Sequence, residues 1–232
     1  MTVKVDVKKL LEAGAHFGHQ ARRWNPKMAP YLYGIQDGVH VFDLIKTKEA
    51  LEVALDVLQE AAKVDKKILL VGTKKQVKDK IREVAQSTGC FFVTERWLGG
   101  TLTNFDQINK SLTKLTDMKK KMEAGEYKSF TKKERLLIER EIARLERFFG
   151  GLVGLSDLPD IMFIVDTKRQ AGAVREAEVK GVETIGIVDS NSDPTVVDYP
   201  IPMNDDATRA LEYLLDLVRE AILEGKKSKT KK

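Results

Sequence analysis

From residue 39 onward, short apolar runs alternate with longer segments in which apolar residues recur every three or four positions. The short runs predict buried strands, and the three-to-four spacing predicts amphipathic helices. The strands are expected at Val39–Asp43, Lys67–Gly72, Phe91–Val93, Ile161–Asp166 and Thr184–Val188. The helices are expected at Lys46–Val64, Lys74–Ser87, Lys168–Lys180 and Asp206–Glu224. This alternation predicts an α/β fold, a doubly wound, mostly parallel sheet flanked by helices.

Residues 104–149 interrupt the alternation with two long polar helices joined at Gly125–Phe130. Asn104 is a candidate N-cap of the first helix, with Gln107 three residues later. The narrow apolar stripes predict an antiparallel two-helix coiled coil that projects from the body. The alternative places both helices flat on the core, although twelve Lys/Arg and eight Asp/Glu in this segment favour projection. The stripes consist of Phe105, Ile108, Leu112, Leu115 and Met122, then Ile138, Ile142, Leu145 and Phe149.

The chain of 232 residues therefore divides into one globular α/β domain, residues 1–103 and 150–224, and an inserted hairpin, residues 104–149. Residues 1–38 form an irregular N-terminal segment of the domain. The tail, residues 225–232, contains five lysines and no acid, and we expect it to be disordered. No run approaches the roughly 18 apolar residues of a membrane span. The lone cysteine, Cys90, excludes an intrachain disulfide and fits a reducing cytosol.

Charge is unevenly distributed along the chain. Residues 1–149 carry 29 Lys/Arg against 20 Asp/Glu, whereas residues 150–224 carry 6 against 15, and the tail adds its lysines. Such a division predicts a molecule with one face that meets phosphate. The alternative is ordinary solvated surface charge.

Two turns place paired basic residues after buried strands. Lys74 and Lys75 follow the strand at 67–72, and Lys168 and Arg169 follow the strand at 161–166. Because parallel strands end at one edge of a sheet, both turns should lie together, where they suit contacts to an RNA backbone. Neither turn matches a nucleotide-binding fingerprint. A nucleotide- or sugar-phosphate-binding enzyme that uses the turn at 71–75 is the competing hypothesis.

Two further segments mix cations with aromatic rings. Arg22, Arg23, Trp24 and Lys27 precede two tyrosines, and Arg96 precedes Trp97. Such mixtures hold phosphates and stack on bases. Packing against the body is an equal alternative for Trp97.

His16 and His19 form a His-x-x-His pair, a spacing found among metal ligands. With Asp189 and Asp205 from later loops, the pair would hold a zinc or magnesium ion. Capping or core packing is the alternative reading of these histidines. The sequence contains neither a Gly-x-Ser-x-Gly elbow nor a His-Glu-x-x-His motif, and the chain is expected not to be an enzyme.

Several motifs, in order, resemble the family of the second protein of the small ribosomal subunit in its bacterial form. The resemblance extends from near the start to about residue 224. It rests on His16-Phe17-Gly18-His19, Arg22 through Met28, Asp43 through Thr47, Val71 through Lys74, Arg96 through Phe105, Pro159 through Gln170 and Ile187 through Pro194. The chain departs from the family's usual pattern at Met203, where members carry glycine.

The resemblance implies a five-stranded parallel sheet with a protruding helical hairpin, sited between the head and body of the subunit. It implies contacts with small-subunit ribosomal RNA and neighbouring ribosomal proteins. It also implies that the protein is cytoplasmic, part of the ribosome, not bound to a membrane and not a homo-oligomer. In many bacteria it also implies support for the large OB-fold protein that gathers messenger RNA. The implied RNA-contacting residues are Arg22, Arg23, Trp24, Lys27, Lys74, Lys75, Arg96 and Asn104, to which the second dibasic turn adds Lys168 and Arg169. A free-standing scaffold that acts through the hairpin remains a further alternative.

Overall fold

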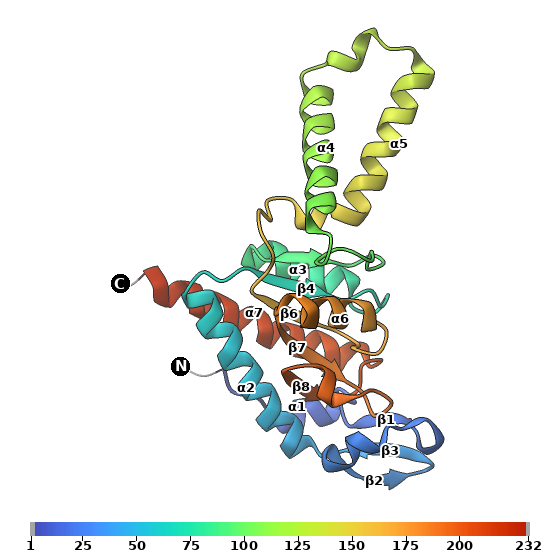
Figure 1. The fold of residues 1–232 in the computed structure, drawn as a ribbon. Coiled ribbons are helices and arrows are strands. Elements are labelled where there is room, and N and C mark those ends of the chain that lie inside the picture. The colour runs from blue at the N-terminus through green and yellow to red at the C-terminus, as the bar shows by residue number, and fades with distance from the viewer. Residues whose placement is uncertain (1–2, 231–232) are drawn as a thin grey trace.

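A five-stranded parallel sheet forms the centre of the molecule (Figure 1). The protein is described by a computed structural model, in which residues 3–230 are defined. The strand order is β5-β4-β6-β7-β8. All residues of β4 and β6 are buried, as expected for strands covered by helices on both faces. The strands are β4 (Ile68–Val71), β5 (Phe91–Val93), β6 (Ile161–Ile164), β7 (Glu183–Val188) and β8 (Tyr199–Pro202).

The five strands are not quite those predicted. The strand predicted at Val39–Asp43 belongs instead to a separate antiparallel sheet of order β1-β3-β2. Asp37 and Gly38 both have positive φ, which fits the two-residue turn of a tight hairpin between β2 and β3. The fifth parallel strand is β8, whose two prolines break the apolar pattern but are tolerated at a sheet edge. The antiparallel strands are β1 (Phe17–Gln20), β2 (Leu32–Gln36) and β3 (Val39–Phe42).

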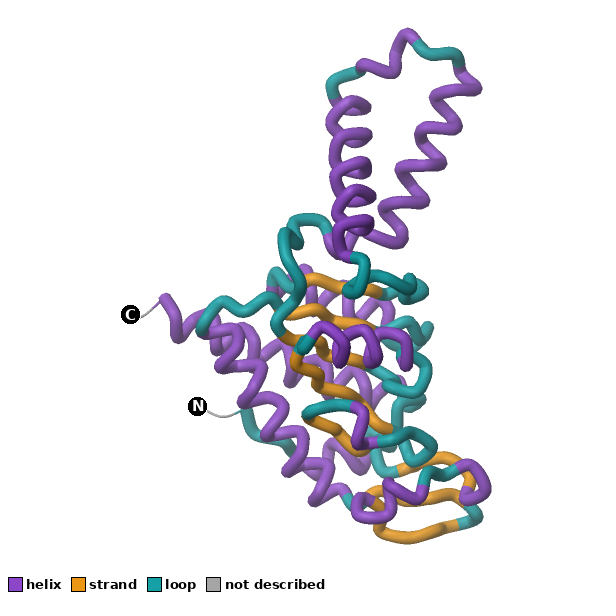
Figure 2. Tube along the Cα trace, viewed as in Figure 1, coloured by secondary structure: helices purple, strands orange, loops and turns teal. Residues whose placement is uncertain are grey.

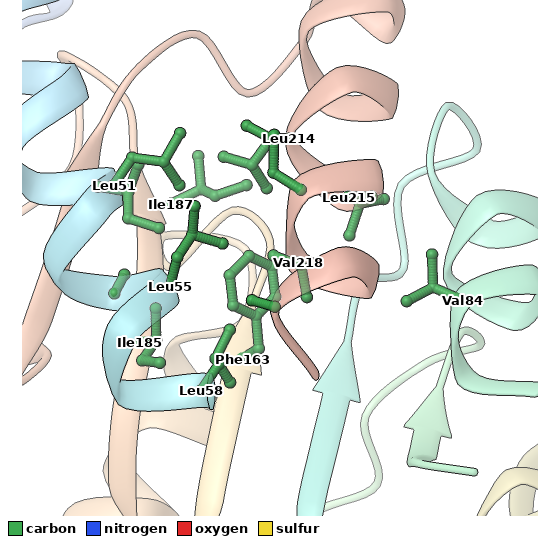
Figure 3. Close-up of a cluster of buried hydrophobic side chains, with 14 of the residues drawn as sticks. Leu51, Leu55, Leu58, Val84, Phe163, Ile185, Ile187, Leu214, Leu215 and Val218 are labelled. Carbon is green, nitrogen blue, oxygen red and sulfur yellow. The ribbon is translucent and has the colours of Figure 1, made fainter. Parts of the chain in front are cut away.

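Helices α2, α3 and α7 cover one face of the parallel sheet. A close-up of this core shows leucines of α2 and α7 against β6 and β7 (Figure 3). Leu51, Leu55 and Leu58 of α2 recur at helical spacing and are almost completely buried. On the other face, α6 packs with the base of the hairpin. The body helices are α1 (Val7–Glu12), α2 (Leu44–Lys63), α3 (Lys78–Thr88), α6 (Ala171–Lys180) and α7 (Thr208–Thr230). No helix in residues 3–230 is long and apolar enough to cross a membrane.

Helices α4 (Phe105–Glu123) and α5 (Lys132–Phe149) form a hairpin that projects from the body (Figures 1 and 2). Its predicted apolar stripe is divided. Ile108 and Leu112 pack into the body, whereas Leu115 packs between the two helices against Ile142 and Leu145. Met122 is 38% exposed, and the helices stand apart towards the tip. The helical hairpin is therefore present, while coiled-coil packing along its length stays a prediction.

The caps of the hairpin differ from those predicted. Asn104 occupies the N-cap position of α4, but its side chain makes no cap hydrogen bond. The capping box lies at the start of α5, where Thr131 and Glu134 bond each other's backbone. Short 3-10 helices complete the chain at Ala21–Arg23, Pro26–Tyr31, Glu126–Ser129, Gly150–Leu152 and Pro194–Val196.

The C-terminal helix continues beyond the predicted start of the tail. Helix α7 reaches Thr230, so the disorder expected from residue 225 does not agree with the structure up to that point. A Cβ at Gly225 would lie 2.3 Å from the backbone oxygen of Gln59, and glycine therefore allows α7 to cross α2 closely. The Lys226 ammonium donates to the Thr88 carbonyl at the end of α3. Residues 231–232 lie outside the described residues, and the prediction is not tested there.

Candidate nucleic-acid interface

The two dibasic turns meet at the carboxyl edge of the parallel sheet, as predicted. Gln170 Nε2, after β6, donates a 2.6 Å hydrogen bond to Thr73 Oγ1, after β4. Both side chains are buried. Helices α3 and α6 begin only at Lys78 and Ala171, so the basic residues lie on the preceding turns rather than in the first helical turn. This edge also receives the loops that follow β5, β7 and β8.

Lys74, a predicted phosphate contact, points into the protein instead. Its ammonium lies 2.6 Å from Asp205 Oδ1, 2.7 Å from Asp206 Oδ1 and 3.0 Å from Asp166 Oδ2. Burial disfavours the lysine charge, but the hydrogen bonds to Asp205 and Asp206 outweigh it and raise the pKa of Lys74. The structure thus gives Lys74 a buried ion-pairing role, which disfavours direct contact with RNA, and its RNA-contacting role stays a prediction.

The environment of Asp205 at this edge disfavours the charged form of its carboxyl group. Its burial and the nearby carboxylates of Asp189 and Asp166 raise its pKa to about 7, against the opposing effect of Lys74. The His19 ring lies 3.0 Å from Asp189 through Nδ1, and this hydrogen bond raises the pKa of His19. Strand β1 can approach the loop after β7 this closely because residue 18 is glycine: a Cβ there would lie 2.7 Å from Ser190 Oγ.

The four predicted metal ligands do not form one set. His16 lies against the ring of Phe17, with centroids 3.9 Å apart and ring planes tilted by 41°, while the His19 ring lies next to Asp189. Asp205 is engaged by the Lys74 ammonium. In the described residues no three His, Cys, Asp or Glu side chains are grouped to hold a metal ion. A zinc or magnesium ion stays a prediction, which metal analysis of the purified protein tests.

Around this buried cluster lies a rim of exposed cations, which we call the basic rim: Lys75, Arg96, Lys168 and Arg169. Lys168 Nζ donates to the Asn191 carbonyl at 3.1 Å, whereas the other three side chains form no ion pair within residues 3–230. Asn104 is exposed beside the same loops, at the base of the hairpin. These residues can meet phosphate without first breaking an internal ion pair.

The N-terminal cations lie at the side of the same edge. The backbone N–H of Asn25 donates to the Ser190 carbonyl at 2.8 Å, which holds this segment against the loop after β7. Lys27 is partly engaged, because its ammonium bonds Asp193 at 2.5 Å. Arg22 and Arg23 are exposed. Trp24 is 37% exposed, and its ring lies 4.9 Å from that of His40.

Glu176 on α6 organises the Arg–Trp loop, a role that the sequence pattern did not reveal. Its carboxylate accepts hydrogen bonds from the Trp97 indole and from the backbone N–H groups of Gly100, Leu102 and Thr103. Burial opposes ionisation, but these donors prevail and lower the pKa of Glu176. A lone acid in an amphipathic helix carries no local sign of a partner more than seventy residues away. Trp97 therefore has a structural bond, as the packing alternative anticipated, and also lines the surface.

The fold and the site together define an α/β protein with an inserted helical hairpin and a cation-rimmed sheet edge. The model of the family "Ribosomal protein S2" matches residues 10–225. The chain is 44% identical over 225 residues to the small ribosomal subunit protein uS2 of Coprothermobacter proteolyticus, covering 97% of this chain and 84% of the relative. It is 46% identical over 222 residues to the uS2 protein of Nitratiruptor, covering 96% and 83%.

The chain belongs to the ribosomal protein S2 family. This confirms the resemblance drawn from the ordered motifs. The family consists of ribosomal structural proteins and not of enzymes, so the competing hypothesis of a nucleotide-dependent enzyme is not supported. Met203, the departure from the usual family pattern, is completely buried and has no positive φ, so the loop does not depend on glycine at this position.

Proposed function

We propose that the protein is a structural constituent of the small ribosomal subunit, where it binds ribosomal RNA between head and body and supports translation without catalysis. Its family and the names of its relatives support the assignment to this subunit. Its place of action is then the cytoplasmic ribosome. The observation that carries RNA binding is the basic rim, whose guanidinium groups at Arg96 and Arg169 form no ion pair within residues 3–230.

At the sheet edge, the buried charges are paired with one another, whereas the exposed charges are mainly cations. The buried carboxylates of Asp166 and Asp205 are held by the Lys74 ammonium, whereas the cations of the basic rim lie outside. A phosphate backbone approaching this edge meets the exposed cations first and releases counterions from the RNA. This arrangement supports binding through the backbone more than through sequence-specific contacts to base pairs.

Neighbouring small-subunit proteins are the second class of partner. We propose that the protein acts as one copy in the subunit and supports the large OB-fold protein that gathers messenger RNA. The projecting hairpin offers a surface for such contacts, since Leu136, Leu137 and Phe130 are exposed on it.

Co-sedimentation of the full chain with small subunits, together with binding to small-subunit RNA over a range of salt, tests the proposal. The test variant is Arg22→Ala/Arg23→Ala/Lys75→Ala. The control is Lys63→Ala/Lys66→Ala/Lys180→Ala, which removes the same charge beyond the opposite ends of the strands. Each phosphate that the variant no longer neutralises should reduce the slope of log K against log salt by about 0.9.

The test variant should therefore have a slope smaller by up to about three units, whereas the control should bind as the wild type does. Binding that is nearly independent of salt would overturn the proposal, as would equal weakening in the two variants. Absence of the protein from the subunit fraction would favour the free-standing scaffold instead.

A further inference from the structure

A cleft of about 450 Å³ opens at the carboxyl edge, within the size range of small-ligand sites. The chain winds from β4 to β5 in one direction and from β6 through β7 to β8 in the other. The cleft therefore lies at the point where the winding reverses, the position at which open α/β sheets bind ligands. Its lining comes from the turns after β4, β5 and β6 and from the first residues of α3 and α6: Thr73, Lys78, Glu95, Arg96, Trp97, Arg169, Gln170 and Gly172.

The charge of the cleft suits an anion. Lys78, Arg96 and Arg169 face a single carboxylate, Glu95. That carboxylate is already paired, because it lies 3.0 Å from the Lys78 ammonium and 3.1 Å from the Arg147 guanidinium of α5. Arg96 and Arg169 form no ion pair with any residue between 3 and 230. Guanidinium groups match phosphate oxygens in a bidentate geometry, so these two arginines are suited to bind a phosphate in the cleft.

The cleft also has an aromatic wall. The indole N–H of Trp97 donates to Glu176 at 3.1 Å, which engages the only polar atom of the ring. What Trp97 offers the cleft is therefore its carbon surface, held in place by the hydrogen bond. Gly172 leaves room beside it, since a Cβ at this position would lie 3.7 Å from the ring. A fixed aromatic surface next to available guanidinium groups is the combination that binds unpaired nucleotides.

We propose that this cleft binds one unpaired nucleotide of an RNA chain, with the base against Trp97 and its phosphate between Arg96 and Arg169. A free nucleotide has the same chemistry, but contacts to the rest of the chain make RNA the stronger ligand. The inference rests on the proposed function for the source of the nucleotide. It adds a discrete site to the broad attraction of the basic rim.

The test compares binding of a fluorescent single-stranded hexanucleotide and of nucleoside monophosphates to the full-length protein. Gly172→Leu places a bulky side chain against the Trp97 ring without changing any charge, and leucine is a better helix former than glycine. Arg96→Ala/Arg169→Ala removes the phosphate-binding groups. The control is Arg175→Ala, which removes an exposed cation of α6 that does not line the cleft.

Gly172→Leu should weaken hexanucleotide binding about tenfold, as loss of one base stack does, with an unchanged salt slope. The arginine variant should weaken binding and also lower the slope, while the control should stay within about twofold. Ultraviolet crosslinking should attach the RNA to the peptide that contains Trp97. Monophosphates should bind much more weakly than the hexanucleotide.

If Gly172→Leu binds the hexanucleotide as the wild type does and the crosslinks lie outside the Trp97 peptide, the cleft is not the nucleotide site. The proposed function would remain intact. Monophosphate binding as tight as that of the hexanucleotide, abolished by Gly172→Leu, would overturn the assignment to RNA. If the thermal transition shows that Gly172→Leu does not fold, the arginine variant and the position of the crosslink decide whether RNA binds in the cleft. Failure of the wild type to co-sediment with subunits would overturn the proposed function instead.

Discussion

The body and the hairpin are stabilised in different ways. In the body, every residue of β6 is completely buried, and both faces of the strand contact apolar side chains. In the hairpin, the apolar contact between α4 and α5 depends on a small cluster, centred on Leu115, Ile142 and Leu145. At its base, Ile108 and Leu112 pack into the body, and further support comes from a capping box and from ion pairs such as Lys114–Glu141. The hairpin should therefore open locally while the body stays folded.

The largest effect should follow removal of a ring from the body. Phe163→Ala should destabilise the protein by about 3 to 5 kcal/mol, because it leaves a cavity in the main core. The control is Phe130→Ala at the hairpin, where the ring is 44% exposed and the change should stay within about 0.5 kcal/mol. Denaturant unfolding measures both. Similar destabilisation in the two variants would contradict the contrast between body and hairpin.

The next effect should be confined to the hairpin. Leu115→Ala should cost about 3 kcal/mol of local stability, because Leu115 is completely buried between the helices. Hydrogen exchange should accelerate in α4 and α5 and remain unchanged in β4 and β6. Leu137→Ala, at a side chain that is 55% exposed, is the control and should leave exchange unchanged. Faster exchange in the central strands would show that the hairpin and body unfold as one unit.

The pH dependence of stability should distinguish the two regions. The pKa of Asp205 is raised to about 7 from 3.8, so between these values the folded state holds the extra proton. Raising the pH through this window should destabilise the body, by roughly 2 kcal/mol between pH 5 and 8. The raised pKa of His19 acts in the same direction. Protonated His19 stabilises the folded state fully below pH 6.5, and this stabilisation is lost as the pH rises through the folded-state pKa.

Asp205→Asn should flatten this dependence, because the titrating carboxyl is gone while Asp166 and Asp206 still hold Lys74. The hairpin should show the opposite sign. Hydrogen bonds from Arg144 and Lys114 lower the pKa of Glu141 to about 2. Ionised Glu141 therefore stabilises the folded hairpin above pH 4.5, and this stabilisation is lost as the pH falls towards 2. Thermal unfolding across pH, followed with hydrogen exchange, measures both. An undiminished slope in Asp205→Asn would refute the assignment to that carboxyl.

The smallest expected effect is at the cap of α5. Thr131→Ala should cost about 1 kcal/mol of helix stability, because it removes the hydroxyl that bonds the Glu134 N–H. Thr131→Ser keeps the hydroxyl and should behave as the wild type. Exchange rates of the first turn of α5 provide the measurement. Equal protection in Ala and Ser variants would mean that the capping box contributes nothing in this hairpin.

Short apolar runs predicted β4, β6 and β7, because a strand covered on both faces is rich in apolar side chains. The same pattern misplaced the strand at residues 39–43, since a short apolar run does not reveal which sheet it will join. Strand β8 escaped prediction because prolines interrupt it. Its position beside β7 depends on pairing, not on its own pattern.

The candidate site was predicted in the same uneven way. The two dibasic turns were expected at one edge, and Thr73 and Gln170 join them there. Lys74 and Lys75 are indistinguishable by type, yet one is buried and the other exposed. The difference arises from Asp205, which lies 131 residues away along the chain. No local pattern carries that information.

By itself, the sequence determined the α/β alternation, the inserted helical pair, the uneven charge and, through its ordered motifs, the family. These depend on composition and on spacing within a few residues, which side-chain periodicity expresses directly. Only the tertiary structure decided which lysine is neutralised, how Glu176 fixes the Trp97 loop, and where a cleft opens between β4 and β6. Those features need side chains from distant segments to meet, and burial then sets which charges are paired and which stay available to a ligand.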